Sequence, residues 1–164
     1  MRLTLLLPFH DGRVMRSILL SFLVVFTFAA ANAAEPLPYE TDPLAITVDG
    51  ERLEWSIELA DDQPERNRGL MFRQSMEPMT GMLFRFEDDQ HVTMWMKNTF
   101  ISLDMLFADA NGTITHIRER TEPESLDIIS SRGPVRYVLE INGGEAKRLG
   151  LKVGQQMDHP AIIN

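Results

Sequence analysis

The residues whose types and spacing could support chemistry are concentrated in one segment near the middle of the chain. There the short hydrogen-bonding side chains of Asn98 and Thr99 follow a predicted strand, at a position where loops commonly carry function. Trp95 precedes them and offers an aromatic surface, and Asp104 follows them. Together with Arg68, these residues predict a cleft with a tryptophan wall and a few polar groups. Such a cleft suits a small polar ligand or an extended peptide.

Two carboxylates stand on strand faces that are otherwise apolar. Asp104 alternates with Leu106 and Ala108, and Glu140 shares a strand face with Val138. Because a buried carboxylate needs a partner or takes a raised pKa, two roles are open. Asp104, with Glu140 as a second group, could serve in a hydrolase or transferase. The structural alternative, which we favour, is that Asp104 accepts backbone N–H groups from the turn before it or pairs with an arginine.

Methionine is abundant, with 10 residues in the chain. Thioether sulfur favours copper(I), and Met94 and Met96 share one face of a predicted strand, so copper(I) binding is a further hypothesis. Methionine more often fills an apolar core, and we favour that role. No histidine has metal-ligand spacing and the chain has no cysteine, so we expect no cofactor.

Several arginines stand close together in an otherwise acidic chain: Arg66, Arg68, Arg73 and Arg85. A guanidinium group matches the geometry of carboxylates and phosphates, so an anion site is one interpretation. We favour internal ion pairs, because acidic partners are available, namely Glu65, Glu77, Asp104 and Glu140.

The charge and composition argue against several classes of protein. The net charge is −8, and no basic patch is interleaved with aromatic residues, which argues against binding to nucleic acid. With no cysteine, the chain is not a disulfide scaffold. The sequence contains neither a Gly-x-Ser-x-Gly nucleophile turn nor a glycine-rich phosphate loop.

The elements that must position these residues are mostly strands. Asp49-Gly50 is a strong hairpin signal, and apolar residues alternate with polar ones after it, which predicts a hairpin over 44–59. Asp62 and Glu65 form a capping box that begins a helix running to about Met71.

The rest of the chain continues this pattern of short strands and closely spaced turns. We expect strands at 81–86, 91–97, 103–108, 113–120 and 135–141, a turn at 87–90, a loop at 122–133, a helix at 145–149 and an edge strand within 151–157. About seven strands and two short helices predict a mainly β (α+β) single domain, either a β-sandwich or a partly closed barrel.

The N-terminal segment has the pattern of a secretory signal peptide. Arg16 precedes an apolar stretch at 18–28, and Ala31-Asn32-Ala33 provides small residues for cleavage. We expect translation to start at Met15 and cleavage to follow Ala33. The apolar stretch is shorter than the roughly 20 residues that cross a bilayer. The mature protein is therefore expected in the periplasm or secreted, and not to span the membrane.

These boundaries divide the chain into four parts. The expected parts are a signal peptide at 1–33, an extended proline-containing leader at 34–43, one β-rich domain at 44–158 and a tail at 159–164.

Four blocks of sequence resemble a known family. They are Arg68-Gly69-Leu70-Met71-Phe72-Arg73, then Gly81-Met82-Leu83-Phe84-Arg85-Phe86, then Trp95-Met96-Lys97-Asn98-Thr99 with Leu103-Asp104, and finally Tyr137-Val138-Leu139-Glu140 with Gly144. In this order they resemble family 192 of the domains of unknown function, over about 44–158. The resemblance implies a compact, β-rich bacterial or archaeal domain, often behind a signal peptide, with no agreed activity and no catalytic residue to carry over. Ser102 stands where the family usually has proline, and Met94 where an aromatic residue often precedes the tryptophan.

These observations together favour a non-enzymatic binding or accessory domain of the cell envelope. Its expected partner is a small polar ligand or an envelope protein, and not nucleic acid. The alternatives are a hydrolase or transferase that uses Asp104 and a copper(I)-binding protein that uses its methionines.

Overall fold

The computed structural model describes residues 41–162. The predicted signal peptide and residues 34–40 of the predicted leader lie outside the described residues. Within 41–162, no helix combines the length and the apolar character needed to cross a membrane.

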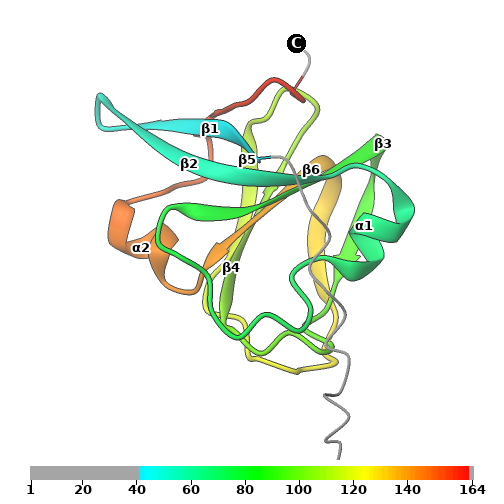
Figure 1. The fold of residues 1–164 in the computed structure, drawn as a ribbon. Helices are drawn as coiled ribbons and strands as arrows, with labels where there is room; N and C mark the ends of the chain where they lie inside the picture. Colours follow the sequence, from blue (N-terminus) through cyan, green and yellow to red (C-terminus); the bar gives the residue numbers. More distant parts are fainter. Residues whose placement is uncertain (1–40, 163–164) are drawn as a thin grey trace, which may run out of the picture. The chain divides into compact units, whose positions relative to one another are not determined.

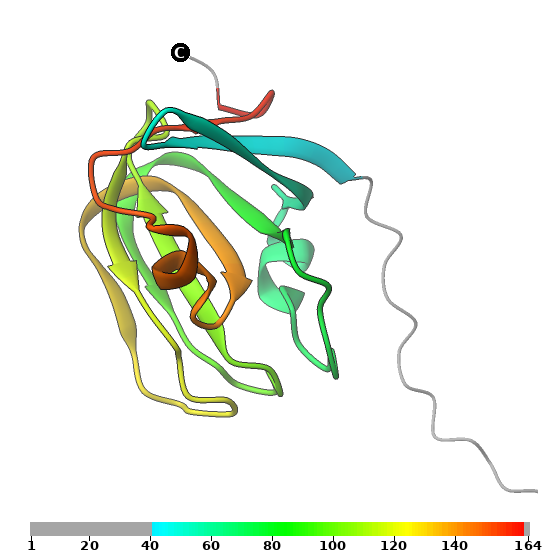
Figure 2. The same cartoon turned by 90° about the vertical axis from the view of Figure 1, so that its left-hand side faces the viewer.

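The domain is built on one strongly curled sheet of seven strands, as Figures 1 and 2 show from two sides. The strands are β1 (Thr41–Val48), β2 (Glu51–Ala60), β3 (Thr80–Met94), β4 (Leu103–Ala108), β5 (Ile114–Arg118), β6 (Ile129–Asn142) and β7 (Met157–Asp158). Their order across the sheet is β5-β4-β6-β3-β2-β1-β7. The sheet forms a half-barrel, which confirms the predicted mainly β class with two short helices.

The first hairpin forms as its sequence predicts. Asp49 and Gly50 both have positive φ, at 49° and 90°, as a type I′ turn requires. The alternation along β2 places Trp55 in the core, where its side chain is 1% exposed. Asn111-Gly112 likewise joins β4 to β5, which pair antiparallel.

Several strand boundaries differ from the predictions. β3 ends at Met94 and not at Lys97, so Met96 lies outside the strand, and β5 ends at Arg118 and not at Arg120. Three further differences concern β1, β3 and β6. β1 begins at Thr41, so the expected leader ends three residues early. The expected turn at 87–90 lies inside one long strand, β3, because the pairing with β6 continues past register shifts between Arg85 and Gln90. Similarly, β6 begins at Ile129, inside the expected loop, because its first residues pair with the end of β3. Bulges allow irregular, polar stretches to remain in a ladder.

The two short helices begin and end at specific caps. Helix α1 (Gln63–Arg68) has the predicted capping box between Asp62 and Glu65, with the Glu65 N–H 2.8 Å from the Asp62 carboxylate. It ends three residues before the predicted Met71, because Gly69 leaves the helical conformation with φ of 47°. Helix α2 (Glu145–Leu149) ends as predicted at Gly150, which is left-handed.

The C-terminal segment differs from the predicted edge strand and tail. Only Met157 and Asp158 form β7, paired with β1. His159 and Ile162, which fall in the predicted tail, are 4% and 8% exposed. This part of the chain therefore packs against the domain.

The sheet buries a hydrophobic cluster on each face. One cluster lies under α2 and the C-terminal segment and includes Leu44, Trp55, Leu106, Leu139 and Ile141. The other lies on the face covered by α1 and the loops after β2 and β3, and includes Leu70, Met82, Phe84, Met96, Met105 and Val138. Since side chains alternate along a strand, neighbouring residues of β4 and β6 belong to different clusters.

Candidate functional site

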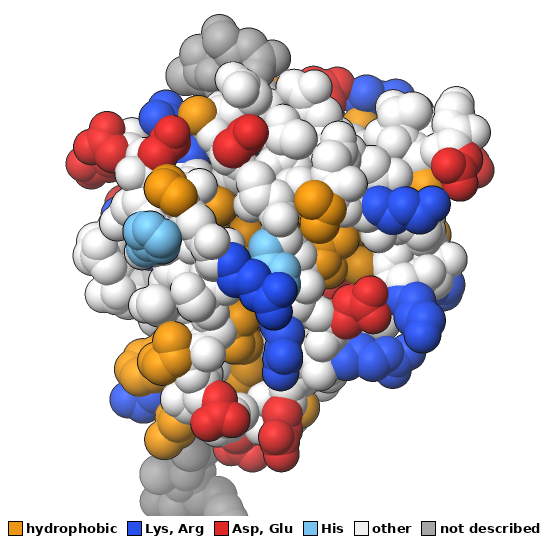
Figure 3. All heavy atoms as spheres, turned by 180° about the vertical axis from the view of Figure 1, so that it is seen from behind, with side chains coloured by type: hydrophobic (Ala, Val, Ile, Leu, Met, Phe, Trp, Pro, Cys, Tyr) orange, Lys and Arg blue, Asp and Glu red, His pale blue; other side chains and the backbone are white. Residues whose placement is uncertain are grey.

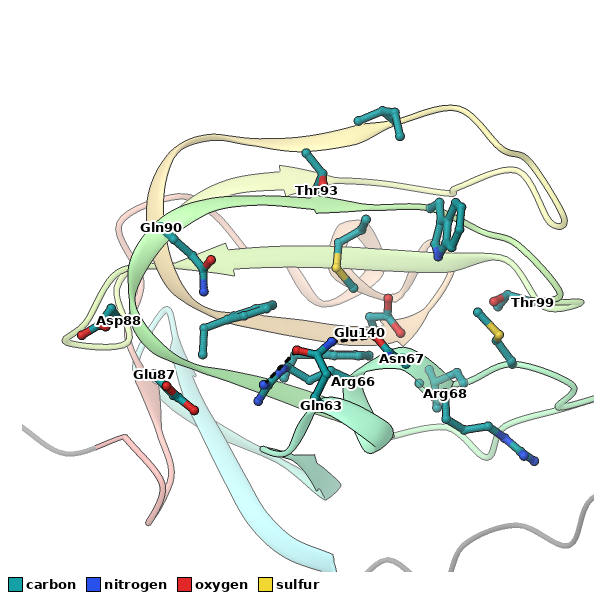
Figure 4. Close-up of a pocket in the computed structure, with 18 residues that line it drawn as sticks. Gln63, Arg66, Asn67, Arg68, Glu87, Asp88, Gln90, Thr93, Thr99 and Glu140 are labelled. Atoms are coloured by element: carbon teal, nitrogen blue, oxygen red, sulfur yellow. Dashed lines mark hydrogen bonds between the residues drawn. The ribbon is translucent and has the colours of Figure 1, made fainter.

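A cavity of about 810 Å³ lies between α1, β3 and the loop that follows β3. Apolar side chains form its walls, among them Leu70, Phe84, Phe86 and Met94, and polar side chains such as Gln63, Asn67, Gln90 and Thr93 stand around them. Figure 4 shows α1 and the sheet on two sides of this space. The volume lies in the range of small-molecule sites, roughly 300–1,000 Å³.

Local sequence features hold α1 at the edge of this cavity. A Cβ at Gly69 would lie 3.1 Å from the Phe84 ring, so glycine permits both the positive φ and the close approach of the chain to β3. Arg66 reaches from α1 to the backbone carbonyl of Arg85, at 2.9 Å, and its guanidinium lies over the Phe86 ring. These contacts fix the helix against the strand without filling the space between them.

Glu140 lies at the floor of the cavity. Its side chain is 4% exposed, and its neighbours across the ladder are Met82 on β3 and Met105 on β4. Within residues 41–162, no group forms a hydrogen bond or ion pair with its carboxyl. Burial raises the pKa of Glu140 from 4.5 to about 8, so the acid holds its proton at neutral pH. In Figure 4 the side chain points from the sheet toward α1.

Three of the predicted ligand-binding residues line this cavity: Arg68, Trp95 and Thr99. Trp95 is 47% exposed, with the Lys97 ammonium 5.1 Å from its ring centre. Thr99 is buried. The Arg68 guanidinium lies 5.4 Å from the Phe72 ring centre and points away from Glu140 in Figure 4.

Asn98 does not line the cavity and has a role in the turn instead. Its φ is 56°, and its carbonyl accepts the Phe72 N–H at 2.8 Å. Its side-chain amide faces the Met71 sulfur at 3.9 Å. Asn98 thereby joins the loop after β3 to the loop after α1.

Asp104 lies on the opposite face of the sheet. It is fully buried, and its carboxylate accepts the N–H groups of Arg120 at 2.7 Å, Gly144 at 2.8 Å and Ala146 at 2.8 Å. Two of these donors belong to the first turn of α2, where a negative charge is stabilised. Asp104 is thus a satisfied carboxylate that holds the start of α2, and the predicted cleft loses this member.

The arginines and methionines have structural partners. Arg73 pairs with Glu58 and Arg85 with Asp61, so ion pairs form as favoured but with carboxylates other than those expected. Met96 is buried in the second cluster, and Met94 packs against it. Among residues 41–162, no group of three or more His, Asp or Glu could hold a metal ion.

A second, smaller hollow of about 490 Å³ involves His116, Arg118 and Arg132. The His116 ring stacks on Phe107 at 5.6 Å, and its pKa is lowered by burial and by the two arginines. On the face turned away from Figure 1, Lys and Arg side chains gather beside a histidine (Figure 3). Unlike the first cavity, this hollow has no buried carboxyl among its lining residues.

Sequence reasoning missed the cavity residues of α1 and β3, such as Gln63, Asn67, Phe84 and Phe86. The one available signal was the alternation that places Phe84 and Phe86 on the same strand face as Met82.

Comparisons with known proteins give a family but no activity. Residues 44–159 match the model of DUF192, described as an uncharacterised ACR. A crystal structure of a protein from Sinorhizobium meliloti 1021, provisionally called a transcription regulator, is 43% identical; the match covers 78% of this chain and 99% of that one, with a TM-score of 0.74. A protein of unknown function from Novosphingobium aromaticivorans DSM 12444 is 35% identical, with 79% and 94% covered and a TM-score of 0.72. No curated protein matches the chain significantly.

Proposed function

The chain belongs to the DUF192 family of uncharacterised domains, and from this premise we propose that it is a non-enzymatic binding domain of the cell envelope that holds a small polar ligand in the cavity between α1 and β3. The observation that carries the proposal is the carboxyl of Glu140, which is buried at the cavity floor and has no hydrogen-bond or ion-pair partner among residues 41–162. A buried polar group without a partner costs about 1–3 kcal/mol. A ligand that supplies the missing partner would recover that cost.

The walls of the cavity support binding of an organic molecule. Trp95, Phe84 and Met94 offer apolar and aromatic surface, while Thr99 and Asn67 offer hydrogen-bonding groups. Ten of the 18 lining residues are polar or charged, so the cavity suits a ligand that has polar groups as well as an apolar body.

The experiment is a thermal-shift screen of small polar molecules, short peptides and envelope sugars, repeated on two matched tryptophan variants. Thr93→Trp places a large ring at the cavity, whereas Thr47→Trp places the same ring on an exposed part of β1. A true ligand should raise the melting temperature of the wild type and of Thr47→Trp but not of Thr93→Trp. A screen whose hits stabilise all three proteins equally would refute the cavity as the binding site.

The location in the envelope is supported by the signal-peptide pattern ending at Ala33. Expression of the full chain in a bacterium, followed by mass spectrometry of the periplasmic fraction, tests it. A mature N-terminus at Ala34 is expected, and an intact chain retained in the cytoplasm would contradict export.

A second candidate function is general acid–base catalysis by Glu140. A pKa of about 8 lies near the physiological range, where a catalytic acid or base is most effective. A hydrolase or transferase of this kind would turn over a ligand found in the screen, and Glu140→Gln would abolish turnover. The alternative built on Asp104 has less support, since both its oxygens already accept backbone N–H groups.

Regulation of transcription, as provisionally assigned to the Sinorhizobium protein, has less support in this chain. Its net charge of −8 opposes association with the phosphate backbone of DNA.

A further inference from the structure

We propose that the ligand of this cavity is an organic ammonium ion, whose charge pairs with Glu140 while its apolar body lies against the aromatic walls. This assignment rests on the proposed binding function and names the chemical class of the ligand. The geometry favours a ligand with a positive charge, because Glu140 is buried among Met82, Met105 and Val138 and no cation within the described part of the chain pairs with it.

The arginines that line the cavity do not supply this charge. Arg66 donates to the carbonyls of Asp61 and Arg85 and lies over Phe86. Arg68 lies over Phe72 and points away from the floor (Figure 4). Consistent with this, burial alone accounts for the raised pKa of Glu140, and no nearby charge lowers it.

The remaining lining favours a cation over an anion. The other ionisable groups that line the cavity are Glu87 and Asp88, both acidic and exposed, on β3. The floor neighbours from β3 and β4 are methionines, and the lining residues from the loop after β3 are uncharged. Aromatic side chains attract cations through their ring faces. Arg66 already lies over Phe86 and Lys97 over Trp95, which leaves the ring of Phe84 in the cavity wall for a ligand cation.

Binding of an ammonium ion in this cavity requires Glu140 to release its proton. Below pH 8 the empty site holds Glu140 as the neutral acid. When the ammonium enters, Glu140 releases its proton to solvent, and the resulting carboxylate accepts hydrogen bonds from the ammonium N–H groups. The floor then contains one negative and one positive charge, and about one proton appears in solution for each ligand bound.

The test uses three probes of matched shape: benzylamine, benzyl alcohol and benzoate. Titrations are followed by NMR of the Trp95 indole and by calorimetry in two buffers of different ionisation enthalpy, which counts released protons. Benzylamine should bind most tightly, and its apparent Kd should fall about 50-fold from pH 6 to pH 8, as the ionised fraction of Glu140 rises.

Two variants test whether the charge of Glu140, and not the shape of its side chain, determines binding. Glu140→Gln preserves the size of the side chain and should abolish both the pH dependence and the preference for benzylamine. Glu54→Gln removes a carboxylate on β2 that does not line the cavity and should behave as wild type.

Each outcome bears on one of the two proposals. Tighter binding of benzyl alcohol or benzoate at the Trp95 indole would overturn the ammonium assignment while leaving the cavity a binding site. Unchanged benzylamine affinity in Glu140→Gln, or no binding of any probe, would also overturn it. The wider proposal is decided separately, by the Thr93→Trp comparison in the ligand screen.

Discussion

The ionisation of Glu140 should lower the unfolding free energy of this protein as the pH rises from about 5 to about 8, and Glu140→Gln should remove this contribution. Burial raises the pKa of Glu140 from 4.5 to about 8. Between these values the folded chain holds a proton that the unfolded chain has released, so stability decreases with rising pH. Each pH unit is worth about 1.4 kcal/mol. The stability gap between wild type and Glu140→Gln should therefore change by about 3–4 kcal/mol over this range, in favour of the variant.

The assay is urea unfolding followed by tryptophan fluorescence at pH 5, 6, 7 and 8, since Trp55 and Trp95 report on the core and on the cavity. Glu54→Gln, altered on β2 away from the cavity, is the matched control and should follow the wild type. If wild type and Glu140→Gln lose stability in parallel over the whole range, Glu140 does not titrate as a buried acid, and the account of the cavity floor fails.

Substitutions at four further positions distinguish residues that stabilise the fold from residues that contact a ligand. Asp104→Asn should lower the unfolding free energy by about 1–3 kcal/mol, because an amide offers one acceptor oxygen to three backbone donors, and urea titration measures this. Trp55→Ala should cost about 3–5 kcal/mol by the same assay, as a core truncation. Trp95→Ala should cost less than about 1 kcal/mol because the ring is half exposed, yet it should weaken binding of any cavity ligand in a thermal-shift titration. Asn98→Ala should lower stability by about 1–2 kcal/mol because of its positive φ, whereas Asn98→Gly should lower it less; equal losses would point to the side-chain contact with Met71.

The parts of the fold that the sequence predicts well are those determined by local contacts. The Asp49-Gly50 turn, the Asp62 capping box and the glycine that ends α2 at Gly150 each depend on residues within a few positions of one another. The length of β3 depends on distant residues. Its polar segment has the composition of a turn, but pairing with β6 keeps it in the sheet.

The site was predictable in part for a similar reason. Arg68, Trp95 and Thr99 are recognisable as exposed or polar residues near element ends, and they line the cavity. The strand alternation identifies Asp104 and Glu140 as buried carboxylates, but it does not say which face of the sheet carries a cavity. Glu140 pairs with Met105 and not with Asp104, so the two carboxylates point to opposite faces. Which of the two carboxylates accepts hydrogen bonds depends on how α1 and α2 lie over those faces.

The parallel pairing of β2 with β3 has a consequence for how the domain folds. Every other strand pair is antiparallel among the described residues, and two of them, β1–β2 and β4–β5, are closed by tight turns. A parallel pair needs a longer crossover, here residues 61–79, and pairs that close long loops form slowly. Helix α1, within this crossover, buries none of its own residues, and Gly69 and Leu70 are the only buried residues of 61–79. The crossover should consequently join the native structure late and detach first in partial unfolding, which gives a molecule in the cavity a way in and out while the hairpins stay folded.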